Sequence, residues 1–142
     1  MTHEGKRNKS RVEFDNTYNA IDEDIERLIS NNFGLSEAEL ENNRRYLNRK
    51  STQLETLSQN LFLHLKMANA IFPNNKAQLS ERQMHQRYAS GCCYGILSTY
   101  EQIFRHLSIS QEKHVEEIKH LHKELNSIKA RRDSDKQRFK DL

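Results

Sequence analysis

The histidines are the first residues in this sequence whose type could support chemistry, because imidazole binds metals and transfers protons near neutral pH. The chain has seven of them. Glu117 and His120 have the E-x-x-H spacing that places two metal ligands on one inner face of a helix in di-iron bundles. Such a site needs two copies of the motif, and this sequence has one. In the heptad frame set by Ile118 and Leu121, both residues flank the apolar seam, so we expect them on a solvated helix face.

Neither the cysteines nor the hydroxyl residues stand in a pattern typical of an active site. Cys92 and Cys93 are adjacent, which disfavours an ordinary disulfide between them, and two cysteines alone do not make a zinc site. The sequence has no nucleophile-elbow, phosphate-loop or zinc-protease motif. We therefore predict a protein that is not an enzyme, without catalytic residues, cofactor or metal ion. Reduced thiols in an apolar segment favour an intracellular location, cytoplasmic or nuclear.

Two clusters of basic residues could bind nucleic-acid phosphates, which requires only suitably spaced cations on a rigid support. The candidate contacts are Arg44, Arg45, Arg49, Lys50, Lys129, Arg131, Arg132 and Arg138. Asp133 and Asp135 oppose the second cluster, and no known nucleic-acid reading motif is present. Cations at the end of a helix also complement its dipole. Nucleic-acid binding is therefore the alternative function.

Length and composition limit the architecture that carries these residues. The chain has 142 residues, of which 35% are hydrophobic and 30% are charged, with a net charge of +3. A compact globular domain has about 45–50% apolar residues. The composition therefore indicates long, slender helices with much solvated surface, or a subunit that completes its core with a partner. No apolar run approaches the length that a membrane helix needs.

An uncharged segment between Arg87 and Glu101 predicts the buried helix of the fold, within residues 80–107. Gly91 and Gly95 lie four residues apart in this segment. A glycine inside a helix costs roughly 1 kcal/mol relative to alanine, so two of them require a reason. We expect that they lie at a close helix–helix crossing.

A second helix is expected over residues 36–72, where Ser36 and Glu39 form a capping box and Pro73 ends the helix. Its apolar stripe repeats at intervals of seven and includes Leu47, Leu54 and Leu61. We expect these leucines, with the two glycines, to form the helix-packing interface. A first helix is expected over residues 10–32, beginning at Ser10 and ended by Gly34 in a left-handed conformation.

The third helix is expected to begin at Ser80, which forms a capping box with Gln83. From there the chain either continues as one helix of about sixty residues or breaks near Ser108–Ser110. We favour a continuous or kinked helix, because no glycine or proline marks a turn. Its last part carries an apolar seam that needs a partner to be stable in water. The seam residues are Ile118, Leu121, Leu125 and Ile128.

The sequence thus predicts an all-α protein with three or four long helices in an elongated bundle and a coiled-coil-like C-terminal helix. Residues 1–9 form a flexible basic tail, residues 10–110 the bundle and residues 111–142 the C-terminal helix. The predicted function is a non-enzymatic interaction or assembly subunit that self-associates or docks into a larger protein complex. We expect an oligomer, without membrane contact.

Overall fold

The structure is a computed structural model. The part of the chain that it describes is all-α. The structure describes the backbone of residues 2–142 and the side chains of residues 16–142. The helices are α1 (Thr2–Ser30), α2 (Glu37–Ala70), α3 (Lys76–His106) and α4 (Val115–Arg138), with short 3₁₀ turns η1 (Asn32–Gly34) and η2 (Gln111–His114). The predicted fold class is therefore confirmed: four helices form a bundle, and the described residues contain no strand.

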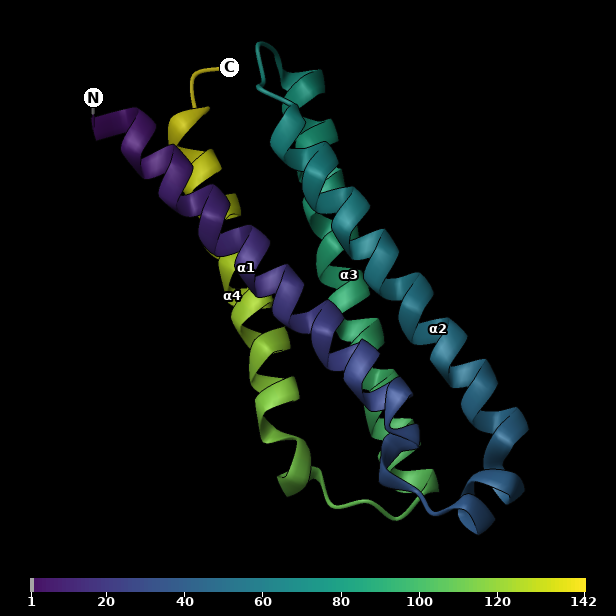
Figure 1. Cartoon of the computed structure of the whole chain (residues 1–142). Coiled ribbons are helices and arrows are strands. Elements are labelled where there is room, and N and C mark those ends of the chain that lie inside the picture. The colour runs from purple at the N-terminus through teal and green to yellow at the C-terminus, as the bar shows by residue number, and fades with distance from the viewer. Residues whose placement is uncertain (1) are drawn as a thin grey trace.

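The helices run alternately down and up, so that each is antiparallel to the next along the chain (Figure 1). The α1–α2 and α3–α4 connections lie at one end of the bundle, and both chain ends lie at the other (Figure 1). The most extensive packing is between α2 and α3, while α4 contacts both α1 and α3. This up-down-up-down arrangement is the one that short connections between helices produce.

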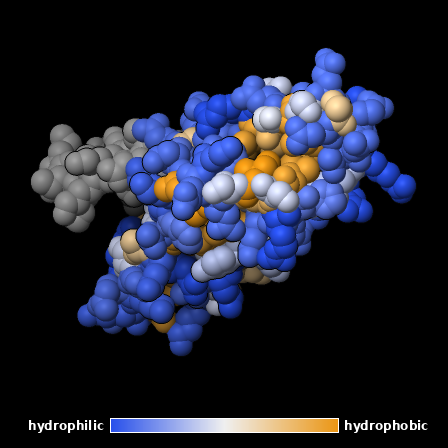
Figure 2. Space-filling model, turned by 90° about the horizontal axis from the view of Figure 1, so that it is seen from below, coloured by the Kyte–Doolittle hydropathy of each residue, from blue (hydrophilic) through white to orange (hydrophobic). Residues whose placement is uncertain are grey.

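The core is made by one face of each helix. Its largest fully buried residues are Ile21, Ile25, Leu54, Leu61, Ile96, Tyr100, Ile103, Phe104, Leu121 and Ile128. Figure 2 views the bundle from the end that carries the two connections. Apolar residues gather in the middle of this view, and hydrophilic residues surround them. The low apolar content of the sequence is therefore compatible with a continuous core, because long helices expose most of their circumference.

The first connection uses left-handed backbone, as the sequence predicts, but over more residues than Gly34. Asn32, Phe33 and Gly34 have φ values of 52°, 55° and 75°. The Phe33 side chain is buried in the core, and burying this ring offsets the cost of a conformation that aromatic residues rarely adopt. The predicted capping box then begins α2, since the Ser36 hydroxyl accepts from the Glu39 amide at 3.3 Å.

The predicted start of the third helix at Ser80 is wrong by four residues. Asn75 is the N-cap of α3, and its side-chain oxygen accepts a hydrogen bond from the Gln78 amide at 2.9 Å. Asparagine is as good a cap as serine, so both patterns were available in the sequence. The earlier cap leaves a shorter connection between α2 and α3.

The continuous helix that we favoured over residues 80–142 is also wrong, because the chain turns back after His106. The amide of Ile109 donates to the Phe104 carbonyl at 2.8 Å, and that of Ser108 donates to the Arg105 carbonyl at 3.3 Å. These two bonds form a Schellman motif, in which a glycine usually occupies the left-handed position. Ser108 occupies it here, with φ of 55°. Ser110 then accepts from the Glu112 amide at 3.3 Å, at the start of η2.

At the N-terminus, α1 begins at Thr2, ahead of the Ser10 start that the sequence predicts. The segment that we expected to be a basic tail is therefore helical from Thr2 onward. The predicted capping box of Ser10 with Glu13 involves side chains that lie outside the described residues. The structure therefore does not test that interaction.

Candidate functional site

The predicted helix-packing interface is correct for the leucines and for one of the two glycines. Leu47, Leu54 and Leu61 are all buried. A Cβ atom placed on Gly95 would lie 3.0 Å from a methyl carbon of Leu57, so α2 approaches α3 closely there. Gly91 is exposed, and a Cβ atom on it would meet nothing within 4 Å. The prediction that Gly91 lies at a close crossing within the chain is therefore wrong.

The predicted association seam on α4 is already occupied by the rest of the bundle. Leu121 and Ile128 are fully buried, while Ile118 and Leu125 are half-buried. Because α4 packs on α1 and α3, these residues need no second chain to leave water. The expectation that they require a partner is wrong, because it depended on a helix that did not fold back.

The inner face of α4 carries three buried acidic residues, whose burial the sequence did not indicate. Glu117, Glu124 and Asp135 are all buried, Glu124 completely. They lie on the same line of the helix as Leu121 and Ile128, one position away from the seam that we expected at Ile118 and Leu125. The expectation that Glu117 lies on a solvated face is therefore wrong.

Charged side chains join the C-terminal part of α1 to the N-terminal part of α4. Asp24 on α1 is buried, and its carboxylate lies 2.6 Å from Nδ1 of His120 and 2.6 Å from the Arg27 guanidinium. Glu117 lies 3.7 Å from Arg27 and 3.5 Å from Nδ1 of His114. The nearby Asp24, through a hydrogen bond, raises the pKa of Arg27. The E-x-x-H pair thus contacts α1 through separate partners, and this arrangement is a structural network.

A second buried ionic contact fixes the far end of α4. The Arg82 guanidinium donates to both oxygens of Asp135, at 2.7 and 3.2 Å, and to the carbonyls of Ala68 and Ile71 at 3.0 Å. Gln86 adds a third donor to Asp135 at 2.9 Å. Arg82, near the start of α3, therefore links the C-terminal ends of α2 and α4. With this many hydrogen-bond partners within the chain, Arg82 has a structural role.

The first basic cluster lies on α2, and its cations are partly engaged. Arg44 contacts Glu41 at 3.0 Å, and Lys50 donates to Gln102 at 2.7 Å. Arg49 lies over the ring of Tyr46, 5.7 Å from its centroid. Arg45 is exposed. This cluster keeps cations at the surface, as phosphate binding would require.

The second basic cluster, at the end of α4, is less available. Arg131 bonds to the side chain of Asn69 on α2. Arg138 lies over the rings of Phe72 and Phe139, at 5.8 and 5.2 Å. Lys129 is exposed, and Arg132 is half-buried. The four cations of this cluster therefore do not form one free basic surface.

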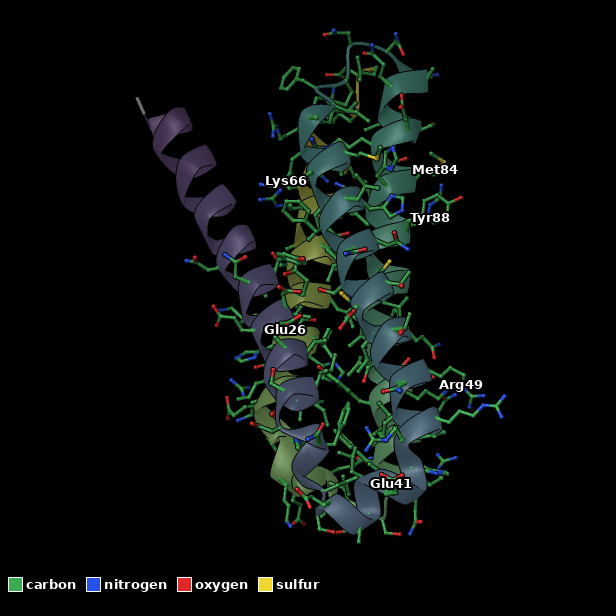
Figure 3. All side chains as sticks on the ribbon, turned by 45° about the vertical axis from the view of Figure 1, so that its right-hand side comes forward. Glu26, Glu41, Arg49, Lys66, Met84 and Tyr88 are labelled. Carbon is green, nitrogen blue, oxygen red and sulfur yellow. The ribbon has the colours of Figure 1, made fainter. Side chains whose placement is uncertain are left out.

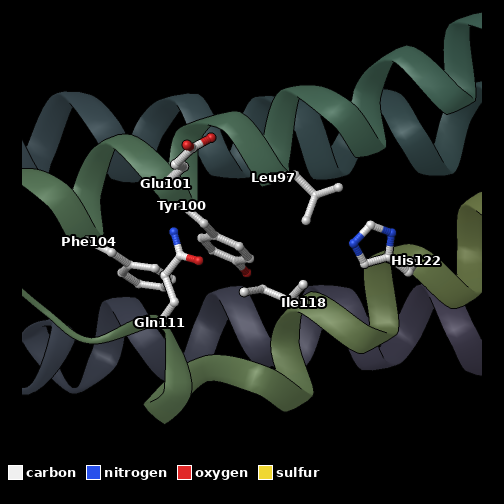
Figure 4. A pocket seen from close by; sticks show the side chains of 7 residues that line it. All are labelled: Leu97, Tyr100, Glu101, Phe104, Gln111, Ile118 and His122. Atoms are coloured by element: carbon white, nitrogen blue, oxygen red, sulfur yellow. The ribbon is translucent and has the colours of Figure 1, made fainter.

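A hollow of about 290 Å³ lies between α3 and α4 (Figure 4). Its lining residues are Leu97, Tyr100, Glu101, Phe104, Gln111, Ile118 and His122. Burial raises the pKa of the Tyr100 hydroxyl, and the charges of Asp24 and Glu117 raise it further. The Tyr100 phenol stays protonated, and the two lining residues that could act as bases, Glu101 and His122, are exposed to solvent. The hollow therefore has the character of an imperfect packing contact.

The buried thiols of α3 give no reactive centre either. Cys92 and Cys93 are unpaired and buried, as the sequence predicts for reduced cysteines. Burial raises the pKa of both thiols, and the Glu124 charge raises that of Cys93 further. A thiol with a raised pKa has little thiolate at neutral pH and is a poor nucleophile.

The outer side of the α2–α3 pair carries the most distinctive exposed surface. Leu63 and Met67 of α2 are 47% and 41% exposed, and Met84 and Tyr88 of α3 are 38% and 54% exposed. Each pair is separated by one helical turn, so its members share a face. In Figure 3, Met84 and Tyr88 project from one side of the helix pair, and Lys66 lies on the other side. We call Leu63, Met67, Met84, Tyr88 and Gly91 the apolar face.

His64 connects the two halves of the apolar face. Its Nδ1 atom lies 3.0 Å from Nδ1 of His85 on α3. Its ring is also tilted against that of Tyr88, with the centroids 5.1 Å apart. These contacts place Leu63 and Met67 beside Met84 and Tyr88. The apolar face is therefore a single surface that spans two helices.

Two uncharged segments lie on one side of the apolar face, while the exposed charges of Glu81 and Arg87 border it near Met84. Residues 56–65 and residues 88–100 contain no Asp, Glu, Lys or Arg. The 3.0 Å approach of Gly95 to Leu57 and the His64–Tyr88 contact show that these two segments lie side by side. In a chain with 30% charged residues, such a gap at the surface is a local specialisation. The sequence signal was the uncharged run, but that run was assigned to the buried core alone.

Comparisons with known proteins add no assignment. No protein-family model matches the sequence, and no curated protein or solved structure gives a significant match. Among the described residues, no helix is long and apolar enough to cross a membrane. The same part of the chain contains no group of three or more His, Cys, Asp or Glu side chains placed to hold a metal ion.

Proposed function

We propose that the protein is a non-enzymatic interaction module that self-associates through the apolar face of α2 and α3. The observation that carries this proposal is the exposure of Leu63, Met67, Met84 and Tyr88 on one surface, beside two segments that contain no charged residue. Centres of protein interfaces are depleted in charged residues and enriched in Tyr and Met. Isolated exposed apolar residues are common, but these four lie together.

A second copy of the chain is the occupant that the charge pattern favours. Two identical charged surfaces repel each other when they meet, whereas two uncharged surfaces do not. A twofold axis also places the same patch of each subunit in contact, which is the commonest arrangement among soluble oligomers. The open space above Gly91 would accept a bulky side chain, such as Tyr88, from the second copy.

The test is the mass in solution of the wild-type protein and of a Met67→Glu/Tyr88→Glu double variant. Light scattering coupled to size exclusion is expected to give a dimer for the wild type. The variant is expected to be a monomer with unchanged circular dichroism, because each added carboxylate would be buried unpaired at the interface. Val115→Glu is the matched control, since Val115 is an apolar residue of similar exposure outside the apolar face.

A wild-type protein that stays monomeric at high micromolar concentration would overturn self-association. So would a dimer that Val115→Glu dissociates as completely as the double variant. The alternative, nucleic-acid binding through Arg44, Arg45, Arg49 and Lys50, predicts affinity for any sequence that falls steeply with added salt. Such binding near physiological ionic strength, lost when these four cations are neutralised, would support that alternative.

A further inference from the structure

The contact between His64 and His85 is the only pairing of two imidazole rings through their nitrogen atoms that the described residues show. The two Nδ1 atoms face each other across the α2–α3 contact at 3.0 Å. Both side chains are half-buried, so solvent reaches the pair from the outside. The helices hold the rings from opposite sides, and this fixes the separation of two nitrogen donors.

We propose that His64 and His85 form a two-histidine chelate site for Cu²⁺ or Ni²⁺, with the metal ion bound by both Nδ1 atoms. When no metal is bound, one ring must donate a proton to the other, because two nitrogens with lone pairs repel at this distance. For both Nδ1 atoms to bind the metal ion, the proton on Nδ1 of the donor ring would move, through solvent, to Nε2 of the same ring. Each ligand ring would then be neutral, with its one proton on Nε2.

The separation of the two nitrogens is compatible with a square or tetragonal metal geometry. With metal–nitrogen bonds of about 2.05 Å, a nitrogen separation of 3.0 Å corresponds to an angle at the metal of roughly 94°. This is close to the angle between neighbouring ligands in the square or tetragonal geometry of Cu²⁺ and Ni²⁺. A tetrahedral Zn²⁺ site would need a separation of about 3.3 Å for the same bond length. Cu²⁺ also has the highest affinity for nitrogen ligands in its series.

Two imidazoles, one from α2 and one from α3, are the protein ligands of the proposed site. The described side chains offer no third His, Cys, Asp or Glu ligand at this place, so water would complete the coordination. The site is therefore open and exchangeable, unlike a closed structural site.

Binding would connect α2 to α3 and stabilise the fold, since the unfolded chain does not hold the two rings together. This consequence is independent of the proposed self-association. Both ligands belong to one chain, so a monomer can bind the metal ion. The experiment can therefore succeed or fail whatever the oligomeric state is.

The experiment uses the full chain with His3 replaced by glutamine. A histidine outside the proposed site can compete for Cu²⁺ and Ni²⁺, so this substitution removes a competing ligand. Calorimetric titration with Ni²⁺ and Cu²⁺ is compared for this background protein, for H64Q, for H85Q and for the matched control H122Q. His122 is an exposed histidine on α4. Mg²⁺, which prefers oxygen ligands, is the control metal.

We expect one metal ion per chain in the background protein and in H122Q, and a rise in Tm on binding. Each of H64Q and H85Q is expected to lose roughly 10²-fold or more in affinity, because linking two weak ligands multiplies their separate affinities by about 10²–10⁴. Electron paramagnetic resonance of the Cu²⁺ complex should show two equivalent nitrogen ligands. Unchanged circular dichroism of H64Q and H85Q confirms that they fold.

Four results would overturn the site. Titration without heat or Tm change in the background protein is the first. Equal affinity in H64Q and in the background protein is the second, because the metal ion would then bind elsewhere. Loss of binding in H122Q is the third. A Cu²⁺ spectrum without nitrogen coupling would also exclude the two imidazoles as ligands.

Discussion

The α2–α3 pair and the α1–α4 pair are both antiparallel helices in contact, but different interactions hold them together. Between α2 and α3 the close approach is apolar, as at Leu57 and Gly95. Between α1 and α4 it runs through charged contacts, with Asp24 against His120 and Arg27 against Glu117. The first pair brings together two uncharged segments, and the second brings together buried acids and their basic partners.

This difference assigns different tasks to the two pairs. Apolar packing leaves exposed apolar residues beside it, and these give the α2–α3 pair a surface suited to contact with another chain. Charged contacts between helices fix which partner helix is correct, since a buried carboxylate without its partner is strongly unfavourable. The α1–α4 pair and the Arg82–Asp135 contact therefore close the bundle, and the α2–α3 pair presents its outer face.

The largest predicted effect is the loss of the ionic contact that joins α4 to α3. Asp135→Ala removes an acid that is 2% exposed and accepts from Arg82 and Gln86. We expect it to lower the free energy of unfolding by about 3–5 kcal/mol, because Arg82 keeps its charge in a buried place without its acid. Urea denaturation measures this change.

Asp133→Ala is the control for that experiment, since Asp133 is exposed on the same helix. We expect it to change the stability by less than about 0.5 kcal/mol. The double variant Arg82→Met/Asp135→Leu should recover part of the loss, because a well-packed apolar pair can replace a buried ion pair. If Asp135→Ala costs no more than Asp133→Ala, the charged contacts do not close the bundle.

The sequence was sufficient to predict the helices of the α2–α3 pair and much less of α4. Leu47, Leu54 and Leu61 repeat at intervals of seven and are all buried, because a regular stripe on a long helix has a single way to face a core. On α4 the predicted seam passes through Ile118, Leu121, Leu125 and Ile128. Of these, Leu121 and Ile128 are buried, but Glu117 and Glu124 complete the buried line in place of Ile118 and Leu125. Acids on a buried line become recognisable only when the partner helices are known.

The turn between α3 and α4 lies at Ser108–Ser110, the alternative that we did not favour, and the reason is local. A serine occupies the left-handed position of the Schellman motif at residue 108, where a glycine would have been recognised. The motif is held by Ile109, which returns to pack on the core. The apolar face escaped prediction because an uncharged run indicates burial equally well by the same chain or by another.

The next effect concerns the α1–α4 pair. Asp24→Asn keeps the shape of a buried side chain but removes the charge that Arg27 and His120 contact. We expect a loss of about 1.5–3 kcal/mol in the free energy of unfolding, the range for hydrogen bonds to a charged group. Glu26→Gln is the control, because Glu26 is exposed on the same helix (Figure 3). Equal stability of the two variants would contradict a role of Asp24 in closing the bundle.

The two glycines of α3 lie on different sides of the α2–α3 pair, Gly95 at the contact with α2 and Gly91 on the exposed side. Gly95→Leu should cost about 1–3 kcal/mol, because its side chain would meet Leu57 in a packed contact. Gly91→Leu should instead gain up to about 1 kcal/mol from helix propensity, since that position opens to empty space. Thermal and urea unfolding are measured at concentrations where the protein is monomeric. A destabilising Gly91→Leu would show that Gly91 is packed within the chain.

The smallest effect is a dependence of the α2–α3 contact on pH through His64. Burial and the neighbouring His85 lower the pKa of His64 in the folded protein, so the unfolded chain binds the proton more readily. Stability should therefore be complete above the ordinary histidine pKa of about 6.5 and should decrease as the pH falls below that value. Subtracting the Tm profile of H64Q from that of the wild type, in the presence of a chelator, isolates this contribution from the other histidines. The difference should be constant above neutral pH and decrease on the acidic side. A difference that is flat across the whole pH range would contradict this prediction, because it would show that the folded protein does not oppose protonation of His64.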